Sequence, residues 1–384
     1  MSISSQPVFC SCPDYEDDHC KEALLSILNE LGGLDWITPG MTIGIKVNLC
    51  AGRKPEAAAT THPALVSALV SLLCEQGARV IVGDSPGEPF TPVVLNRIYS
   101  MCGMNRVREA GALLNDNYDH QEVSFPDGVS VQNFECCTWL SQCDAIINFC
   151  KLKSHGLMGM TAAVKNLYGI IPGTRKSEYH FMHPDPGDFA NLLCDLNEYL
   201  KPRLVLVDAV QVMEGNGPTQ GTPRFMGLLI GGINPYEVDR FCASLLGVDE
   251  SEIPYLAAAI KRGLLSEEDR YNTAQYTAPY ALKDFVRSGA TSSWFLEDDK
   301  DSLGKKVLKK GLYYIMRSRP VPDSSCTGCG HCAKGCPANA ITIKNKKAHI
   351  RRSQCVRCFC CQEFCPFGAM KAERSLIAKL ASGK

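Results

Sequence analysis

The sequence predicts an α/β fold, with a mostly parallel sheet sandwiched by helices, followed by a small α+β domain rich in cysteine. Two observations predict the larger part. Short runs of β-branched and apolar residues alternate with helical patterns from about residue 5 to 250, and the runs are apolar enough to be buried on both faces. The smaller part is predicted by cysteine, because nine of the 21 cysteines fall between residues 326 and 365.

The first predicted strand and helix show clear periodicity. Residues 42–49, TIGIKVNL, alternate strictly, with four apolar side chains on one face and Lys46 and Asn48 on the other. Residues 62–77 then predict a helix, because apolar residues recur at helical spacing, Pro63 suits the first turn and a glycine ends the run. Further buried strands are expected at 79–87, 144–151 and 203–210.

The chain is less regular after residue 250. Its sequence predicts a helix at 252–264, an irregular segment at 271–280 and a basic helix at 303–318. We interpret the basic helix as a solvated face beside the next domain, with docking of an acidic redox partner as the alternative. The predicted domains are 1–250 (α/β domain with a ligand cleft), 251–318 (helical and irregular extension and linker), 319–372 (cysteine-rich domain) and 373–384 (C-terminal tail).

Charge and hydropathy exclude several classes of function. The chain has 40 Lys and Arg against 41 Asp and Glu, so it has no global signature of nucleic-acid or bilayer binding, and any basic site must be local. The longest apolar runs are far shorter than the roughly 20 residues that span a bilayer. The first residues lack the basic and apolar regions of a secretory signal. We expect a cytoplasmic protein with no membrane span and no nucleic-acid partner.

Two cysteine stretches, 326–337 and 355–366, share the pattern C-x2-C-x2-C-x3-C-P. This spacing wraps three thiolates round one 4Fe-4S cluster and sends the fourth to the other cluster. Cys360 is interpreted as a bystander, although it could replace Cys361 as a ligand. The alternative is a pair of zinc sites. The pattern predicts two 4Fe-4S clusters, the first bound by Cys326, Cys329, Cys332 and Cys365 and the second by Cys355, Cys358, Cys361 and Cys336.

The residues between and around these stretches support one compact domain. Residues 341–350, ITIKNKKAHI, predict a hairpin between the two halves. The module resembles the two-cluster bacterial ferredoxins over about 50 residues, with all eight ligand positions matched. The resemblance implies low-potential, one-electron transfer through both clusters and therefore a redox partner protein.

Polar residues follow the predicted strands, at the edge where open parallel sheets bind ligands. Residues 148–166 concentrate cations there. Gly156 and Gly159 predict a loop that leads into a helix, and backbone N–H groups in such a loop and at a helix N-terminus favour anions. With Lys151, Lys153 and Lys46, this region predicts a pocket for carboxylate or phosphate, and His155 could supply a proton. Neither a P-loop nor a strand leading into G-x-G-x-x-G is present, so no tightly bound nucleotide is predicted.

Simpler interpretations stay open for these side chains. Lys151 and Lys153 could be exposed charges at a strand end, and Lys165 a solvated helix residue. Asp84 and Asp208 could cap helices or turns. The histidines and the remaining cysteines of this region could be surface or packing residues rather than catalysts or a third metal site; they are His155, His180, His183, Cys136, Cys137, Cys143 and Cys150.

Several stretches together resemble a known prokaryotic family. They are residues 45–49, 60–66, 82–87, 151–169, 207–218 and 238–247. The chain is similar to the family named domain of unknown function 362, members of which are often fused to a two-cluster ferredoxin tail. The resemblance implies one functional cleft that contains Lys46, Asn48, Asp84, Lys151, Lys153, His155, Lys165, Asn166, Asp208, Glu214 and Asn216.

We therefore predict an iron–sulfur oxidoreductase that passes electrons from a redox partner through two 4Fe-4S clusters to a small anionic substrate. Lys151, Lys153 and His155 are the predicted catalytic residues, with His155 delivering protons. The alternatives are an electron carrier whose α/β domain docks a partner enzyme, and a redox-sensing or cofactor-assembly protein. The predicted substrate-binding residues are Lys46, Asn48, Asp84, Lys165, Asn166, Asp208, Glu214 and Asn216, with the lysines stabilising negative charge and the three carboxylates orienting the lysines or a metal.

Overall fold

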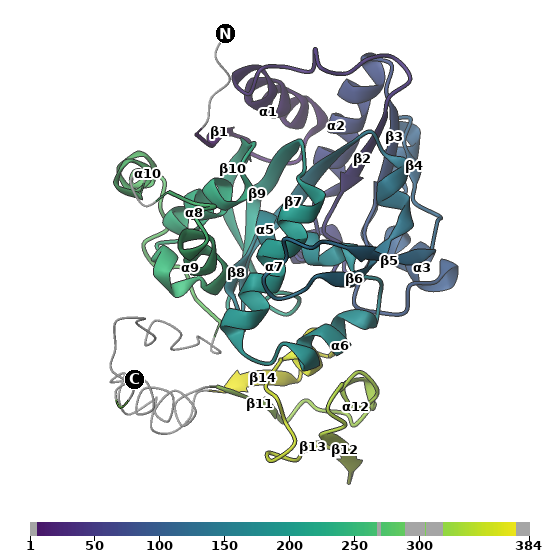
Figure 1. Ribbon diagram of the computed structural model, residues 1–384, viewed down its shortest axis with the longest axis vertical. Coiled ribbons are helices and arrows are strands. Elements are labelled where there is room, and N and C mark those ends of the chain that lie inside the picture. Colours follow the sequence, from purple (N-terminus) through teal and green to yellow (C-terminus); the bar gives the residue numbers. More distant parts are fainter. Residues whose placement is uncertain (1–5, 267–269, 289–303, 305–317, 374–384) are drawn as a thin grey trace.

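The computed structural model describes residues 6–266, 270–288, 304 and 318–373 (Figure 1). Most of the predicted basic helix and most of the predicted tail lie outside these residues. A large α/β body carries the sheet, and residues 318–373, called the cysteine-rich module below, form a smaller body at one end of it.

The large body is built on an eight-stranded sheet in the order β1-β10-β9-β7-β2-β3-β4, with β8 paired to the end of β7. Neighbours from β4 to β9 are parallel, whereas β10 and β1 are added in antiparallel pairings. The predicted α/β fold is confirmed, with an antiparallel edge on the parallel sheet. The strands are β1 (Val8–Ser11), β2 (Thr42–Lys46), β3 (Arg79–Gly83), β4 (Leu113–Leu114), β7 (Ala145–His155), β8 (Gly159–Thr161), β9 (Leu204–Glu214) and β10 (Thr222–Gly232).

Two layers of helices bury the sheet on both faces (Figure 1). Alternate residues of β7 show this, because Ile147 and Phe149 enter the core under α1 to α4, and Ile146 and Leu152 enter the core under α5 and α7 to α9. Burial on both faces is why the strands are continuously apolar. The helices are α1 (Asp17–Glu30), α2 (Pro63–Glu75), α3 (Pro92–Met101), α4 (Arg106–Glu109), α5 (Ala163–Asn166), α6 (Arg175–Met182), α7 (Pro186–Leu200), α8 (Pro235–Leu245), α9 (Pro254–Lys261) and α10 (Arg270–Thr277), and a separate hairpin joins β5 (His120–Ser124) to β6 (Asn133–Cys137).

Local sequence sets where three of the long helices begin. Each starts with a proline at its first position, preceded by a side chain that accepts a backbone N–H bond of the first turn. His62 accepts from the Ala64 N–H group at 3.3 Å, and Asp185 and Asn234 accept at the starts of α7 and α8. A capping side chain followed by proline therefore marks the start of each of these three helices in the sequence.

The structure differs from the sequence prediction in three segments. β7 and β9 continue past their predicted ends to His155 and Glu214. The loop predicted after Lys153 is instead a short hairpin in which β8 returns along β7, and the helix that follows, α5, has only four residues. The prediction that residues 271–280 are irregular is wrong, because α10 covers most of them and packs on α8, where Thr277 and Ser244 share a hydrogen bond of 2.5 Å.

The cysteine-rich module contains two small antiparallel pairs and two short helices. The hairpin predicted at 341–350 is confirmed, and its turn residues Asn345 and Lys346 have φ values of 48° and 56°. In Figure 1 this hairpin lies at the end of the module that is farthest from the sheet. The elements are β11 (Arg319–Pro322) paired with β14 (Met370–Glu373), β12 (Ile341–Lys344) paired with β13 (Lys347–Ile350), α12 (His331–Lys334) and α13 (Cys360–Glu363).

Candidate active site

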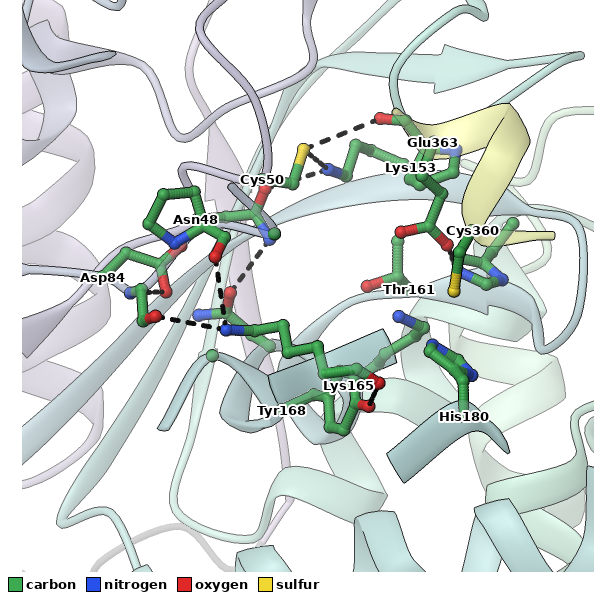
Figure 2. A pocket seen from close by; sticks show the side chains of 18 of the residues that line it. Asn48, Cys50, Asp84, Lys153, Thr161, Lys165, Tyr168, His180, Cys360 and Glu363 are labelled. Carbon is green, nitrogen blue, oxygen red and sulfur yellow. Dashed lines mark hydrogen bonds and ion pairs between the residues drawn. The ribbon is translucent and has the colours of Figure 1, made fainter. Parts of the chain in front are cut away.

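A pocket of about 630 Å³ lies between the strand ends of the sheet and the cysteine-rich module. Figure 2 shows Asn48 and Asp84 of the large body on one side of it, and Glu363 and Cys360 of α13 on the other. The module therefore supplies one wall of the pocket. The other residues that line it are Cys50, Ser85, Pro86, Gly87, Lys153, His155, Thr161, Lys165, Asn166, Tyr168, Gly169, Lys176, His180, Pro218 and Phe364.

Lys153 crosses one wall of the pocket and is held at three points. Its Nζ donates to Asn48 Oδ1 at 2.9 Å, to the Ala59 carbonyl at 2.7 Å and to Cys50 Sγ at 3.3 Å. The side chain is only 1% exposed, so the alternative of an exposed strand-end charge is wrong. The three bonds fix the ammonium group in one position, which a substrate contact requires.

The floor of the pocket contains a buried ion pair. Lys46 Nζ lies 2.7 Å from Asp84 Oδ1, and both side chains are almost completely buried. Asp84 also accepts the backbone N–H groups of Leu49 at 2.6 Å and Ser85 at 2.8 Å. Gly169 covers the pair so closely that a Cβ atom there would overlap both charged groups. The pair therefore supports the pocket from below and has no room for a ligand between its partners.

His155 links the large body to the module. Its Nδ1 accepts the backbone N–H groups of Leu157 and Met158 at 3.0 and 3.1 Å, so the proton is on Nε2, which donates to Glu363 Oε1 at 3.1 Å. Burial lowers the pKa of His155 to about 4, so the ring is neutral at pH 7. Burial alone would raise the pKa of Glu363, but the hydrogen bond from His155 and the charge of Lys165 hold it well below its usual value.

Three further basic side chains face this space. Burial lowers the pKa of Lys165, although the Glu363 carboxylate opposes the shift, and its Nζ lies 5.5 Å from the centre of the Tyr168 ring. Burial also lowers the pKa of Lys176 to about 8 and that of His180 to about 3. The pKa of Lys176 is therefore closer to neutrality than that of His155 or His180.

Only some of the predicted site residues meet in this pocket. Those that line it are Asn48, Asp84, Lys153, His155, Lys165 and Asn166. Lys46 lies directly beneath them. The structure does not place Lys151, Asp208, Glu214 and Asn216 among the lining residues.

Lys151 forms a separate buried cluster. Its Nζ lies 2.8 Å from Asp208 Oδ2 and donates to Tyr15 Oη at 2.9 Å, and the Tyr15 ring stacks on His62. An irregularity in the pairing of β7 with β9 falls between Lys151 and Lys153, so the two lysines do not occupy equivalent positions along β9. Spacing in the sequence could not reveal this irregularity.

The other two predicted residues also have partners within the chain. Glu214 lies 3.4 Å from Arg224 and accepts the backbone N–H group of Val286 at 3.1 Å. Asn216 accepts from Gln362 of the module at 2.5 Å. Asn216 therefore joins the two bodies together.

The helix N-terminus predicted to attract an anion is filled by the chain itself. The backbone N–H groups of Ala163 and Val164, at the start of α5, donate to the Asp239 carboxylate at 2.7 and 3.1 Å. Burial raises the pKa of Asp239 to about 7. The prediction of an anion site at this helix is wrong, because a carboxylate from α8 already occupies it, and the positive side chains of the pocket are what remain to attract an anion.

Sequence patterns assign no role to Cys50, Lys176 and Glu363, and they leave His180 as a packing or surface residue, although all four line the pocket. For Glu363 the sequence carries no signal, because its partner His155 is 208 positions away. For Lys176 the signal is also absent, since its lowered pKa comes from burial that depends on the tertiary structure. The four cysteines between residues 136 and 150 agree with the packing interpretation, because Cys136, Cys137 and Cys150 are buried and Cys143 is partly buried.

Direct contacts fix the module against the pocket. Gln220 Nε2 donates to the Cys365 carbonyl at 2.9 Å, and Thr219 Oγ1 donates to the Glu363 carbonyl at 3.2 Å. A Cβ atom on Gly87 would lie 2.7 Å from the Phe364 ring, so a glycine is needed for this close approach. The wall that α13 supplies is therefore in close contact with the large body.

The predicted ligand cysteines lie near one another in the module. A cavity of about 330 Å³ is lined by the four cysteines of the predicted first set. The thiols of Cys355, Cys358 and Cys336 lie close enough to Cys361 for their charges to raise its pKa, after the larger effect of burial. The N–H groups of Ala369 and Ala340 point at the sulfurs of the two ligands that cross between clusters, Cys365 at 3.2 Å and Cys336 at 3.3 Å. Such bonds stabilise negative charge on cluster sulfurs.

The described residues contain no site for a single metal ion and no helix suited to span a membrane. Within them, no three His, Cys, Asp or Glu side chains gather closely enough to hold one metal ion. None of the described helices is both long and apolar enough to cross a membrane.

Comparison with known families agrees with this architecture. Residues 43–244 match the family model described as domain of unknown function DUF362. The chain belongs to the DUF362 family. Residues 325–369 match a 4Fe-4S dicluster domain, so the cysteine-rich module of this DUF362 protein is an iron–sulfur, ferredoxin-like domain. Both predicted resemblances are confirmed.

Among its relatives are a thylakoid-associated protein of Synechocystis and an uncharacterized protein of Methanocaldococcus jannaschii. The first is 30% identical over 262 residues, which cover 65% of this chain and 77% of the relative. The second is 47% identical over 38 residues, 10% of this chain and 17% of the relative.

Two solved structures show weaker similarity. The lactate racemase apoprotein of Thermoanaerobacterium thermosaccharolyticum is 14% identical with a TM-score of 0.40, over 64% of this chain and 58% of that one. A Thermotoga maritima protein is 13% identical with a TM-score of 0.35, over 53% of this chain and 52% of that one.

Proposed function

We propose that this DUF362 protein is an iron–sulfur oxidoreductase that binds a small anionic substrate in the pocket between the sheet and the module. One observation carries the proposal: the pocket is lined by Lys153 and Lys165 on the large body, and by Cys360 and Glu363 from the segment that also carries the second set of cluster ligands. A molecule held by the lysines would therefore lie next to a source of electrons. We propose that all eight predicted cysteines bind two clusters.

When bound, the clusters would supply one-electron transfer between an external donor and the pocket. The chain's own residues have the remaining tasks. Lys153 is held by its three bonds and Lys165 faces the same space, so both ammonium groups would attract a carboxylate or phosphate and stabilise the negative charge that an arriving electron adds.

A proton is needed to neutralise that added charge. Our candidate donor is Lys176, because it lines the pocket and its pKa of about 8 lies close to physiological pH. Its Nζ donates to Ser85 Oγ at 3.2 Å and to the carbonyls of Pro86 and Ile171, so delivering a proton to a substrate means exchanging one of these bonds. His155 has a different task in this proposal. Both of its nitrogens are already bonded, so it orients Glu363 and holds α13 against the pocket and does not itself deliver protons.

The substrate can be sought directly. Anaerobically purified protein should carry a small anionic compound that mass spectrometry detects, and the double substitution Lys153→Met/Lys165→Met should remove it. The matched control is Lys21→Met, which neutralises an exposed lysine that pairs with Glu75 on the far helices α1 and α2. The compound should then reoxidise dithionite-reduced wild-type protein at least about tenfold faster than the double variant, as expected for the loss of one or two charge contacts.

Two results would oppose this proposal. One is that no anion is enriched in wild-type protein relative to the double variant. The other is that the double variant, with full iron content, is reoxidised as fast as wild type by the compound found. Either result would favour the alternative of an electron carrier whose large body only recognises a partner enzyme.

A further inference from the structure

The cysteine-rich module is strongly basic within a chain of almost zero net charge. Residues 324–362 contain no Asp or Glu, although the whole chain has 41 of them. The same stretch contains seven cations, at Lys334, Lys344, Lys346, Lys347, Arg351, Arg352 and Arg357. All except Arg357 are exposed. We call the six exposed side chains the basic patch.

The basic patch is centred on the hairpin of β12 and β13, which lies at the end of the module away from the sheet (Figure 1). The tip of this hairpin touches the loop of the first cysteine set. A Cβ atom on Gly328 would lie 2.6 Å from the backbone of Lys346, so the hairpin and the loop approach as closely as a glycine allows. Next to Gly328, Cys329 is exposed. The patch therefore lies beside the solvent-facing edge of the first set of cluster ligands.

Two apolar side chains lie beside the same edge. Ile343 is 37% exposed and Phe367 is 57% exposed, and both line the cavity that the cysteines of the first set share. An apolar spot with charges around it is the arrangement of a protein docking surface, which has a dry centre and a polar rim. A nucleic acid or a lipid layer would also use the cations, but only a redox partner would use the exposed cluster-ligand edge at Cys329.

The two cysteine sets also face different ways. The second set is carried by the segment that lines the pocket through Cys360 and Glu363, whereas the first set includes the exposed Cys329 beside the hairpin. Cys332 and Cys361 pack in one cluster of buried side chains, so the two sets are neighbours. The module thus has an outer side, suited to a partner protein, and an inner side at the pocket.

We propose that the basic patch docks an acidic one-electron carrier protein, which donates its electron through the edge marked by Cys329. One electron leaves the reduced carrier and enters the oxidised cluster held by the first set, and no bond or proton is exchanged between the proteins. Opposite charges steer such a pair together and raise its association rate by about 10 to 1,000 times at low salt. This proposal rests on cluster binding by the module and does not depend on turnover in the pocket.

The test uses reduced flavodoxin, a small acidic flavoprotein, and the full-length protein with its clusters. Stopped-flow absorbance measures the second-order rate of cluster reduction, and titration with oxidised flavodoxin measures the affinity. The substitution Lys344→Glu/Lys347→Glu reverses the charges of two exposed lysines that lie opposite each other in the hairpin. It avoids Lys346, whose backbone is in the left-handed region. We expect the rate and the affinity to fall at least about tenfold, with a smaller fall for Lys344→Gln/Lys347→Gln.

The matched control is Arg79→Glu/Arg108→Glu, which makes the same change of charge at two exposed positions of the large body. It should leave both values within about twofold of wild type, and 0.5 M salt should remove the difference between wild type and the hairpin variant. Iron content, measured for every variant, shows that the module has kept its clusters.

Three outcomes would overturn the proposal. The first is that the hairpin variant, with full iron content, matches wild type in rate and affinity. The second is that the control falls as far as the hairpin variant, which would make the effect one of net charge. The third is that vesicles containing phosphatidylglycerol, or a single-stranded RNA 20-mer, bind wild type more tightly than flavodoxin and lose this binding in the hairpin variant. If no substrate binds in the pocket, the proposed reaction is wrong, but the expected rates and affinities with flavodoxin stay the same.

Discussion

Replacing Asp84 by asparagine should destabilise the protein strongly. The Asp84 carboxylate faces three donors: the Lys46 ammonium group at 2.7 Å and the backbone N–H groups of Leu49 and Ser85 at 2.6 and 2.8 Å. An asparagine has one acceptor oxygen and one NH2 group, so at least one of these donors would meet another donor. The Lys46 charge would lose its counter-ion in a place where water cannot reach it.

The size of the effect follows from this burial. The Lys46 side chain is fully buried, and removing one partner of a buried ion pair costs about 3 to 5 kcal/mol. Two backbone carbonyl or amide oxygens, of Val47 and Asn166, still accept from Lys46 and favour the lower end of that range. For a domain of this size, each kcal/mol changes the melting temperature by roughly 2 to 4 °C, which gives a fall of roughly 6 to 20 °C.

The assay is thermal unfolding of anaerobically prepared protein, followed by circular dichroism at one scan rate and pH 7.5. The control is Glu75→Gln, which removes an exposed partner of Lys21 and should change the free energy of unfolding by about 1 kcal/mol or less. The double variant Lys46→Met/Asp84→Asn should melt above Asp84→Asn alone, because the unpaired charge is gone. A fall of less than about 2 °C for Asp84→Asn would refute the reasoning, as would a double variant that melts below it.

Three further predictions concern the pocket and the module. Cys360→Ala should keep the iron content of wild type, about eight per chain, whereas Cys361→Ala should lose about half; equal losses in both would contradict the proposed ligand set. Gly169→Ala should lower the melting temperature, because its Cβ would overlap Lys46 and Asp84, and a variant as stable as wild type would show that the pocket floor adapts. The free energy of unfolding should fall as the pH falls from 6.5 towards 4, because His155 binds a proton in the unfolded chain but not in the folded one, where its pKa is about 4. For this residue the free energy changes by at most about 1.4 kcal/mol per pH unit, and His155→Gln should reduce that slope.

Much of the fold could be predicted from local pattern. The strict alternation at 42–49 became β2, and the proline-initiated apolar run at 62–77 became α2, because both signals lie within one element. The antiparallel edge of the sheet was not predicted. β1 pairs with β10, which is far from it in sequence, and β10 runs antiparallel to β9. An apolar run in the sequence shows neither the direction of its strand nor the strand with which it pairs.

The candidate site was predicted in part. Lys153, His155 and Lys165 do line one pocket, since the first two lie at the end of β7 and Lys165 lies in α5, directly after the hairpin of β7 and β8. Lys151 has the same local sequence context but pairs with Asp208 in a separate buried cluster. The predicted anion site at a helix N-terminus failed because Asp239, 76 positions away, fills it. Both errors have the same origin. In each case a carboxylate that is distant in the sequence pairs with the positive group, and the sequence does not show that the two lie side by side.

The iron–sulfur chemistry of the module could be predicted from the sequence alone. The spacing of the cysteines predicts the iron–sulfur module, because three of the four ligands of each cluster lie on one short loop and their separation is a local property. The tertiary structure alone decided which polar residues face each other across the pocket. The contact between His155 and Glu363, and the position of α13 at the pocket wall, depend on packing between residues more than 200 positions apart, and no local pattern specifies such a distance.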